Sequence, residues 1–364
     1  MQVLWIFNHP APYKIDFFNE LGKLCDLTVI FERPSEGDRN PSFYCEKSQN
    51  FKEVILHSVK IGQHNNFTLK VKSIIKHSKA DIIVMNGYST FSEMIGVSYL
   101  HHHKRPYVFA INGGIAKPSE SSFKKHIKSS LISGASLYLA PDDRSVSYLS
   151  YYGADISKAC LYPYSTVFQK EIIDTPLSVE EKESIRLSRG LPKEHLFVSV
   201  GQFIKRKNNM ALLEAWKNVS KDKTLLLIGG GKEKKKYESF VASNGLSNVK
   251  ILPFKNHNDI LDLYRIADSS IFLTKEDIYG HVVNESLSQG CPVIASKNSN
   301  SALHLIKNGE NGYLIDLSIK DIAGAIDLPF TEEMRDNAIK VASSNSIELM
   351  AMAHYQIFKR FLEQ

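Results

Sequence analysis

Three consecutive cations in the second half of the chain could bind a diphosphate. A short apolar run, typical of a strand, ends at Gly201, and Lys205, Arg206 and Lys207 follow before the next helix. Open α/β sheets bind ligands at the carboxyl ends of their parallel strands. The forked guanidinium of Arg206 and the compact ammonium of Lys207 could hold a diphosphate there without a metal ion. A run of cations is more often a solvated surface, so this segment needs a second feature beside it.

A pair of carboxylates supplies that feature. Asp277 and Glu285 stand on either side of Gly280, and a helix is predicted to begin at about His281. The free N–H groups and the positive dipole end of a helix start attract anions. Glu285 could accept hydrogen bonds from vicinal hydroxyls near such an anion, and Asp277 could reach groups beyond it. This interpretation is favoured over the simpler one, in which both acids only stabilise the helix electrostatically.

Two other motifs do not predict cofactor sites. The glycines at residues 229–231 match neither GxGxxG nor a GK[ST] loop, so we interpret them as a tight structural turn. The histidines at residues 101–103 would point about 100° apart on a helix and could not converge on one ion. We therefore expect neither a metal site nor a cofactor. His9, in the loop after the first strand, is expected to border a ligand site.

Alternating strand and helix patterns must position these residues. The first series has strands at residues 3–7, 27–31, 81–85, 107–111 and 137–139. Prolines at residues 163–195, with a charged stretch at 179–189, indicate a linker and a surface helix.

The alternation of strand and helix patterns then begins again. Strands are predicted at residues 197–200, 224–228, 250–252, 270–274 and 292–295, and a last helix at residues 347–362. This alternation predicts an α/β protein with two doubly wound parallel-sheet domains facing across a cleft. We expect residues 1–170, with 346–364, to form one domain and residues 171–345 the other.

Composition agrees with a two-domain globular protein. The chain has 364 residues, which is more than one hydrophobic core normally holds. Its residues are 43% hydrophobic and 23% charged, which is an ordinary composition for a globular protein. We find no signal-peptide pattern, no run long enough to span a membrane and no CxxC among four scattered cysteines, so we expect a cytoplasmic protein. Residues 1–170 carry 20 Lys and Arg against 14 Asp and Glu, whereas the rest is neutral. The basic half could face an anionic partner or could be an ordinary solvated surface, and the charge count alone leaves both interpretations open. Nucleic acid is not favoured, because no aromatic–basic strand motif appears.

The second half resembles a known family. Gly201 with Arg206 and Lys207, the segment 277–295 and the segment 308–314 are similar, in this order, to the donor-binding half of the GT-B retaining glycosyltransferases of family 4. Segments 11–21 and 161–166 extend the resemblance more weakly into the first half.

The resemblance implies roles for particular residues. Asp277 would contact the transferred sugar, Glu285 the ribose, and Arg206 and Lys207 the diphosphate. Gly280, His281 and Val282 would offer backbone donors, and Phe254 would border the base. The acceptor side would include His9, Tyr13, Lys14, Asn112 and Gly113, and the last helix would return to the N-terminal domain.

The chain also departs from the family pattern. Gln202 replaces an arginine that many members carry beside the strand glycine, and residues 8–12 replace a Gly-Gly loop. Asn112 stands near the position of a histidine in many members.

The activity that follows from the resemblance is sugar transfer with retention of configuration. A nucleotide diphosphate sugar, with UDP expected, would be the donor, and a hydroxyl of a glycan or lipid-linked molecule the acceptor, in bacterial surface polysaccharide or glycoconjugate synthesis. No metal would be required. Lys14, Lys117, Lys124, Lys125 and Lys128 are the cations expected to meet an anionic acceptor or the inner face of the cell membrane. Two alternatives remain: a nucleotide-sugar epimerase or hydrolase, and a non-catalytic nucleotide-sugar-binding subunit.

Overall fold

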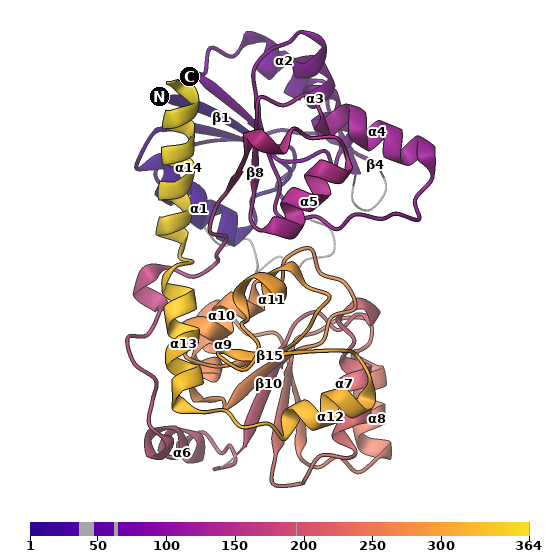
Figure 1. Cartoon of the computed structure of the whole chain (residues 1–364), viewed down its shortest axis with the longest axis vertical. Coiled ribbons are helices and arrows are strands. Elements are labelled where there is room, and N and C mark those ends of the chain that lie inside the picture. The colour runs from indigo at the N-terminus through magenta and orange to yellow at the C-terminus, as the bar shows by residue number, and fades with distance from the viewer. Residues whose placement is uncertain (36–46, 62–64, 194, 364) are drawn as a thin grey trace. The chain divides into compact units, whose positions relative to one another are not determined.

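The computed structural model describes residues 1–35, 47–61, 65–193 and 195–363, and they form two compact units (Figure 1). One unit contains Met1–Thr166 together with Ser346–Gln364, and the other contains Val167–Asn345. Among the described residues, we find no helix with the length and apolar character needed to cross a bilayer.

The first unit is built on a parallel sheet of seven strands in the order β3-β2-β1-β6-β7-β8-β9. These strands are β1 (Gln2–Phe7), β2 (Asp26–Phe31), β3 (Lys52–Ile55), β6 (Ile82–Met85), β7 (Val108–Ala110), β8 (Leu137–Ala140) and β9 (Ala159–Leu161). A separate antiparallel pair joins β4 (Val59–Ile61) to β5 (Asn65–Phe67). The central strands are buried apolar runs, as expected for a parallel sheet covered on both faces.

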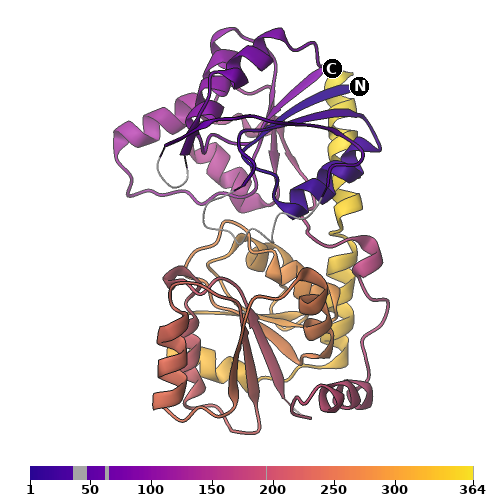
Figure 2. The ribbon, with the colours of Figure 1, turned by 180° about the vertical axis from the view of Figure 1, so that it is seen from behind.

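Helices cover both faces of this sheet (Figures 1 and 2). They are α1 (Pro12–Gly22), α2 (Lys70–His77), α3 (Phe91–His102), α4 (Ser122–Ile132), α5 (Asp143–Tyr151) and, from the end of the chain, α14 (Ile347–Leu362). A short 3₁₀ turn spans Ile156–Lys158. α1 begins at Pro12, whose fixed φ is already suited to the first position of a helix and whose missing N–H is not needed there.

The last helix belongs to the first unit, as the resemblance implied. α14 packs along α1. Its buried His354 lies against the rings of Trp5, Phe17 and Tyr162, with centroids 4.4–5.6 Å apart. These aromatic contacts fix α14 on the face of the sheet that α1 covers.

The second unit has a parallel sheet of six strands in the order β12-β11-β10-β13-β14-β15. The strands are β10 (Leu196–Val200), β11 (Thr224–Ile228), β12 (Val249–Leu252), β13 (Ser269–Phe272), β14 (Val293–Ser296) and β15 (Gly312–Ile315). The helices are α6 (Val179–Ser188), α7 (Asn209–Trp216), α8 (Lys234–Ser243), α9 (His257–Ile266), α10 (Val282–Ser288), α11 (Asn300–Leu305), α12 (Ile319–Ile326) and α13 (Glu332–Ser343). Short 3₁₀ turns span Gln169–Glu171 and Lys205–Lys207.

The charged helix α6 is not the purely surface helix that its composition predicted. Arg186 is buried, and it donates from Nε to the carbonyl of Ile266 at 2.7 Å and pairs with Asp268 at 2.9 Å. A buried charge needs such partners, so these contacts anchor α6 beside α9 and β13.

Candidate active site

The strand order of the second unit places a topological switch between β10 and β13. From β10 the chain proceeds outward to β11 and β12, whereas β13, β14 and β15 extend the sheet the other way. The loops that leave β10 and β13 therefore diverge, and ligands of open α/β sheets bind at this point of the carboxyl edge. These two loops carry the three predicted catalytic residues.

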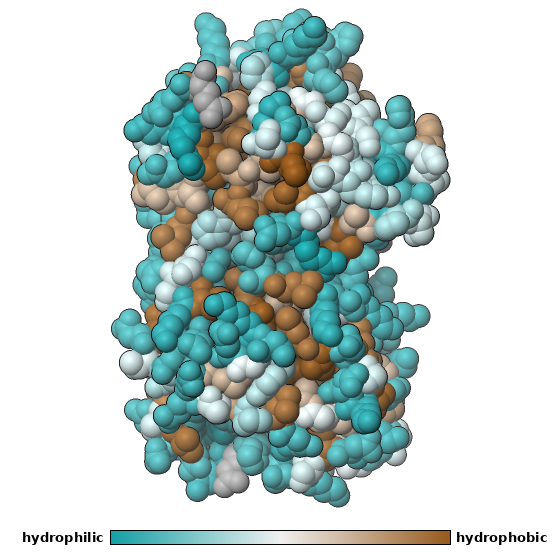
Figure 3. Space-filling view, viewed as in Figure 1, coloured by the Kyte–Doolittle hydropathy of each residue, from teal (hydrophilic) through white to brown (hydrophobic). Residues whose placement is uncertain are grey.

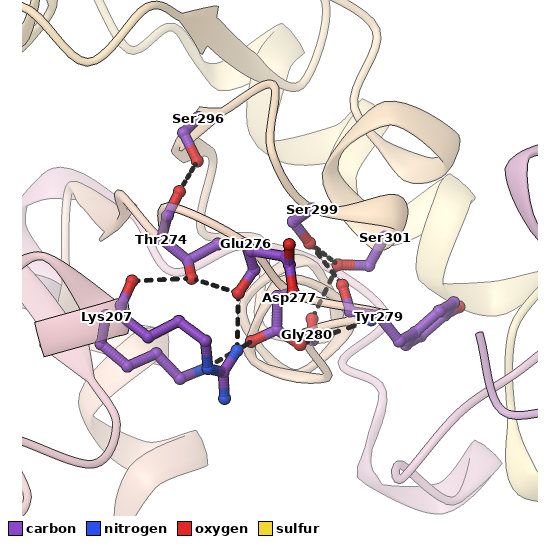
Figure 4. A network of polar contacts seen from close by, with 10 residues as sticks. Lys207, Thr274, Glu276, Asp277, Tyr279, Gly280, Ser296, Ser299 and Ser301 are labelled. Carbon is purple, nitrogen blue, oxygen red and sulfur yellow. Dashed lines mark hydrogen bonds and ion pairs between the residues drawn. The ribbon is translucent and has the colours of Figure 1, made fainter. Parts of the chain in front are cut away.

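The three residues meet at one carboxylate oxygen (Figure 4). Lys207 donates from Nζ to Oδ2 of Asp277 at 2.6 Å, and Arg206 donates from Nη1 to the same oxygen at 3.1 Å. Arg206 also donates to the carbonyl oxygen of Glu276 at 2.6 Å. The side chains of Asp277 and Lys207 are 12% and 15% exposed, against 43% for Arg206. The contact to Lys207 is therefore the more shielded of the two ion pairs.

Asp277 is ionised in this arrangement. Burial by itself would raise the pKa of its carboxyl, but the charges of Lys207 and Arg206 outweigh the burial and hold that pKa below its usual value. The site thus holds two cations and one anion within hydrogen-bond distance. The excess positive charge suits an anionic ligand such as a diphosphate.

Three serines, one at the end of β14 and two just after it, hold the loop of Asp277 and were not among the predicted site residues (Figure 4). Ser296 donates from Oγ to the carbonyl of Thr274 at 2.6 Å, and Ser301 donates to the carbonyl of Gly280 at 2.8 Å. Ser299 donates from Oγ to the carbonyl of Tyr279. The signal in the sequence is the concentration of serines at the carboxyl end of a buried strand and just beyond it.

Gly280 is required at its position. Its φ is +97°, and a Cβ there would lie 2.6 Å from the ring of Phe272 and 3.0 Å from Oγ of Ser299. The ring of Phe272 also has the ammonium of Lys207 4.8 Å from its centroid. The close approach at Gly280 therefore lets one aromatic ring contact both the glycine loop and the cation.

The helix after Gly280 begins at Val282, with His281 as its preceding cap residue. Glu285 is half-buried on this helix and donates its backbone N–H to the carbonyl of His281 at 3.0 Å. Burial first and the charge of Glu285 second raise the pKa of the Tyr264 hydroxyl.

Gly201 and Phe254 occupy other parts of the same edge. The N–H of Gly201 donates to the carbonyl of Ile228 at 3.0 Å, and a Cβ on Gly229 would overlap the carbonyl oxygen of Gly201. The glycine turn at residues 229–231 is thus explained by close backbone packing. Phe254 follows β12, the outer strand of the sheet, and is 55% exposed. The structure does not bring Phe254 into contact with the Asp277 cluster.

The predicted acceptor-side residues lie at the carboxyl edge of the first sheet. His9 follows β1 and is half-buried, while Asn112 and Gly113 follow β7. Lys14, in the first turn of α1, donates from Nζ to Oδ1 of Asn112 at 2.8 Å and lies 5.9 Å from the ring centroid of Tyr13. The structure therefore joins Tyr13, Lys14 and Asn112.

Two of the predicted surface cations are engaged inside the first unit. Lys14 is only 1% exposed, so the expectation that it meets a membrane is wrong. Lys128 pairs with Glu120 at 2.6 Å and donates to the hydroxyl of Tyr152 at 3.2 Å. The ammonium groups of Lys14 and Lys128 therefore contact side chains of the same unit. The sequence pattern did not indicate these contacts.

The second unit matches a described protein family. Residues 181–344 match the model of the glycosyl transferases group 1 family. The uncharacterized glycosyltransferase YqgM of Bacillus subtilis is 24% identical over 200 residues, which cover 52% of this chain and 55% of that protein. The uncharacterized glycosyltransferase MJ1178 of Methanocaldococcus jannaschii is 28% identical over 144 residues, covering 37% of this chain and 40% of that protein. These matches span about half the length of the curated relatives or less.

Solved structures match both units. Anabaena Alr3699/HepE in complex with UDP has a TM-score of 0.76 at 18% identity, covering 100% of this chain and 99% of that one. Sucrose-phosphate synthase from Thermosynechococcus elongatus has a TM-score of 0.77 at 16% identity, covering 99% of each chain. WaaG, a glycosyltransferase involved in lipopolysaccharide biosynthesis, has a TM-score of 0.71 at 16% identity, covering 98% of this chain and 99% of that one. The chain therefore has the two-domain α/β fold of the GT-B type.

Proposed function

We propose that this chain, whose residues 181–344 form a glycosyl transferases group 1 domain, transfers a sugar from a nucleotide diphosphate sugar to a hydroxyl group. The observation that carries the proposal is the meeting of Arg206, Lys207 and Asp277 at the switch point of that domain. UDP is the favoured nucleotide, because a structural neighbour that matches the whole chain holds UDP.

Each group in the donor site has a distinct task in this proposal. Arg206 and Lys207 bind the diphosphate and offset the charge that grows on it as the glycosidic bond breaks. Asp277, relieved of part of its pairing, accepts hydrogen bonds from hydroxyls of the transferred sugar. Glu285 accepts from the ribose. Backbone N–H groups at residues 280–282 donate to phosphate or sugar, Gly201 leaves room beside Lys207, and the exposed ring of Phe254 borders the base.

The reaction proceeds with retention in this proposal. The acceptor hydroxyl attacks the anomeric carbon from the side of the departing diphosphate. A bond from the acceptor oxygen to that carbon forms, the bond from the carbon to the phosphate oxygen breaks, and the departing phosphate takes the hydroxyl proton. Arg206 and Lys207 supply positive charge at that phosphate, so we propose that no metal ion is needed.

We assign the acceptor to the first unit and favour a lipid-linked one. A groove of about 450 Å³ lies along α3, and Phe67, Phe91, Met94 and Tyr99 contribute apolar surface to it. Lys72, His102 and His103 also line it, and no acidic residue does so within the part of the chain that the structure describes. Apolar surface bordered by a cation suits an amphiphile that carries a phosphate.

Helix α4 provides a second amphipathic surface on the same unit. Phe123 is 73% exposed and Ile127 37% exposed, and both stand among lysines, as the mixture of colours over α4 in Figure 3 illustrates. Apolar side chains beside exposed lysines are typical of helices that lie in a membrane interface. We therefore propose peripheral contact with the cytoplasmic face of a membrane, in the synthesis of a bacterial surface polysaccharide or glycoconjugate.

The experiment that tests the proposal separates transfer from its alternatives. A panel of UDP-, GDP- and ADP-sugars is first screened for thermal stabilisation, because a ligand at about 100 times its Kd adds about 2.7 kcal/mol of stability. The best donor is then incubated with and without polyprenyl-diphosphate-linked saccharides. A glycosylated lipid that retains the anomeric configuration supports the proposal. Rapid donor turnover without acceptor would favour an epimerase or hydrolase, and donor binding without turnover a non-catalytic subunit.

A further inference from the structure

Lys14 occupies an unusual environment in the first unit. Its side chain is 1% exposed, and its ammonium lies 4.7–5.5 Å from the ring centroids of Phe7, Phe17 and Tyr164. Oδ1 of Asn112 accepts a hydrogen bond from it at 2.8 Å. Among the described residues Lys14 forms no ion pair, so the aromatic faces and one amide oxygen stabilise its charge.

The contact with Lys14 determines which way the amide of Asn112 points. A lysine amine in its charged form has only donors, so the amide must turn its oxygen toward it and its NH₂ group away. Asn112 is half-buried, and its Nδ2 has no hydrogen-bond partner within the described part of the chain. Since Asn112 follows β7, its two N–H donors lie at the carboxyl edge of the first sheet, where ligands of such sheets bind.

Burying the charged amine of Lys14 is energetically unfavourable, and a structural role does not explain why a lysine stands there. Burial lowers the pKa of Lys14 to about 7, which shows that this site disfavours the charged amine. A methionine has nearly the same length and would fill the aromatic site without that cost. A buried ionisable side chain that an apolar one could replace points to a requirement other than stability.

We infer that Lys14 is a positioning residue, which fixes the amide of Asn112 so that its N–H groups donate to an oxygen of the acceptor. The ligand chemistry is that of a hydrogen-bond-accepting oxygen, and we assign it to a hydroxyl of the acceptor saccharide. This inference rests on the proposed sugar transfer and adds the first-unit residues that orient its second substrate. Without Lys14, the amide can turn its oxygen outward and repel the same acceptor oxygen.

The test compares four variants of the whole 364-residue chain. Asn112→Ala removes the donors, and Lys14→Met frees the amide to rotate. Asn112→Asp keeps an oxygen for Lys14 but presents a second oxygen outward instead of an NH₂ group. We expect each to raise the acceptor's KM about 3- to 10-fold with an unchanged donor Kd, since one hydrogen bond is lost. The double variant Lys14→Met with Asn112→Ala should be no worse than Asn112→Ala alone.

Lys182→Met is the matched control. Lys182 is also a buried lysine, 3% exposed, and its pKa is likewise lowered to about 7, first by burial and then by the charge of Arg335, but it belongs to the second unit. This variant should leave the acceptor's KM unchanged.

The outcomes separate this inference from the proposed function. Additive effects of the two substitutions, or an unchanged acceptor KM in soluble Lys14→Met, would overturn the positioning role. A change in donor Kd instead would assign the pair to the donor sugar and also overturn it. If the wild type transfers no sugar, the proposed function fails, and the coupling is then measured by a double-mutant cycle on unfolding free energy, in which independent contributions would contradict the Lys14–Asn112 contact itself.

Discussion

Lys207 and Asp277 come from the loops after two neighbouring strands and hold each other at 2.6 Å between Nζ and Oδ2. The cation and the carboxylate that are assigned to different parts of the donor are thus paired when no donor is present. When a donor binds, its diphosphate oxygens must replace part of the contact that Lys207 makes with Asp277. The ion pair keeps the Asp277 carboxylate ionised and holds both side chains in place until then, which reduces the reorganisation needed on binding.

Arg206→Ala and Lys207→Ala should both lower kcat more than they raise the donor's KM, because the charge on the leaving group is larger in the transition state. They should differ in stability. Lys207→Ala leaves the largely buried Asp277 without its main partner and should lower the free energy of unfolding by about 1–3 kcal/mol. Arg206 is 43% exposed, so Arg206→Ala should cost about 0.5 kcal/mol or less.

Steady-state kinetics and urea unfolding of the same preparations measure both effects. Lys205→Ala is the matched control, because Lys205 belongs to the same short turn but is exposed. A rise in KM alone, with unchanged kcat in both variants, would mean that these cations only bind the donor.

Glu285→Ala should weaken UDP and the intact nucleotide sugar to a similar extent. The lost contact is a charge-assisted hydrogen bond to the ribose, which corresponds to about 1.5–3 kcal/mol, or about ten- to a hundredfold in Kd. Isothermal titration with UDP measures the change, and Glu285→Gln serves as the conservative control because it keeps an acceptor oxygen. An unchanged Kd for UDP in folded Glu285→Ala would exclude the ribose contact.

Much of this site could be expected from the sequence, because its elements are local. The apolar runs predicted the central strands, and the order of the cations, Gly280 and the two acids placed them at strand ends. The ion pair of Lys207 with Asp277 could not be foreseen in the same way, since it depends on which strands become neighbours in the sheet. The edge strand β15 was also missed, because it begins at Gly312 and is only partly buried.

The burial of Lys14 shows the limit of charge patterns. Position 14 lies three, four and seven residues before Phe17, Phe18 and Leu21, so the helical period places it on the buried face of α1. A lysine in the first turn of a helix can nevertheless extend its ammonium to solvent, so the pattern alone does not predict that the charge is buried. Its burial results from Tyr164, which follows β9, and from Asn112, which follows β7. Both lie about 100 residues or more along the chain and reach Lys14 only through the tertiary fold.

Removal of divalent metals should leave sugar transfer intact. Arg206 and Lys207 supply the positive charge at the diphosphate in our proposal, so treatment with EDTA should change the rate by less than about twofold. Transfer is measured before and after dialysis against EDTA, with Mg²⁺ and Mn²⁺ added back to separate aliquots. Activity that is lost in EDTA and restored by either ion would contradict the metal-independent mechanism.

Two buried acids at the carboxyl edge of the first sheet should make a contribution to stability that falls with rising pH. Thr90 donates its hydroxyl to Oε1 of Glu32 at 2.8 Å and its backbone N–H to Oε2 of Glu93 at 3.1 Å. Burial raises the pKa of both carboxyls, and the charge of Glu93 raises the pKa of Glu32 further. At these two carboxyls the folded state therefore binds more protons than the unfolded state from about pH 4.3 upward, and their contribution to stability falls until the raised pKa values are passed.

Glu32→Gln removes one of these acids while keeping an oxygen for Thr90. The variant should unfold at a higher temperature than the wild type at pH 8 and show a flatter dependence of Tm on pH. At pH 5, where the wild-type pair is protonated, the difference should shrink. Calorimetry between pH 5 and 8 measures this, with Glu333→Gln on an exposed position of α13 as the control. A Tm difference that does not change with pH would show that Glu32 does not titrate in this range.

Contact with an anionic membrane should depend on the exposed residues of α4. Lys124 is exposed on this helix beside the 73% exposed Phe123. Lys125 is half-buried with its ammonium 4.0 Å from the ring centroid of Tyr151, and Lys128 is already paired with Glu120. Each lysine near an anionic surface contributes about 1 kcal/mol, so Lys124→Gln with Lys125→Gln should weaken binding to vesicles containing phosphatidylglycerol by about thirtyfold. Phe123→Ser should weaken it further by removing apolar insertion.

Because the attraction is screened beyond about 8 Å at 0.15 M salt, wild-type binding should fall as salt rises. Vesicle co-sedimentation measures these effects, and Lys235→Gln with Lys236→Gln, exposed on α8 of the second unit, provides the same change of charge elsewhere. Equal losses of vesicle affinity in both pairs of lysine variants would mean that only net charge matters. Vesicle binding that changes neither with salt nor with the α4 substitutions would contradict membrane contact through α4 and favour a soluble glycan as the acceptor.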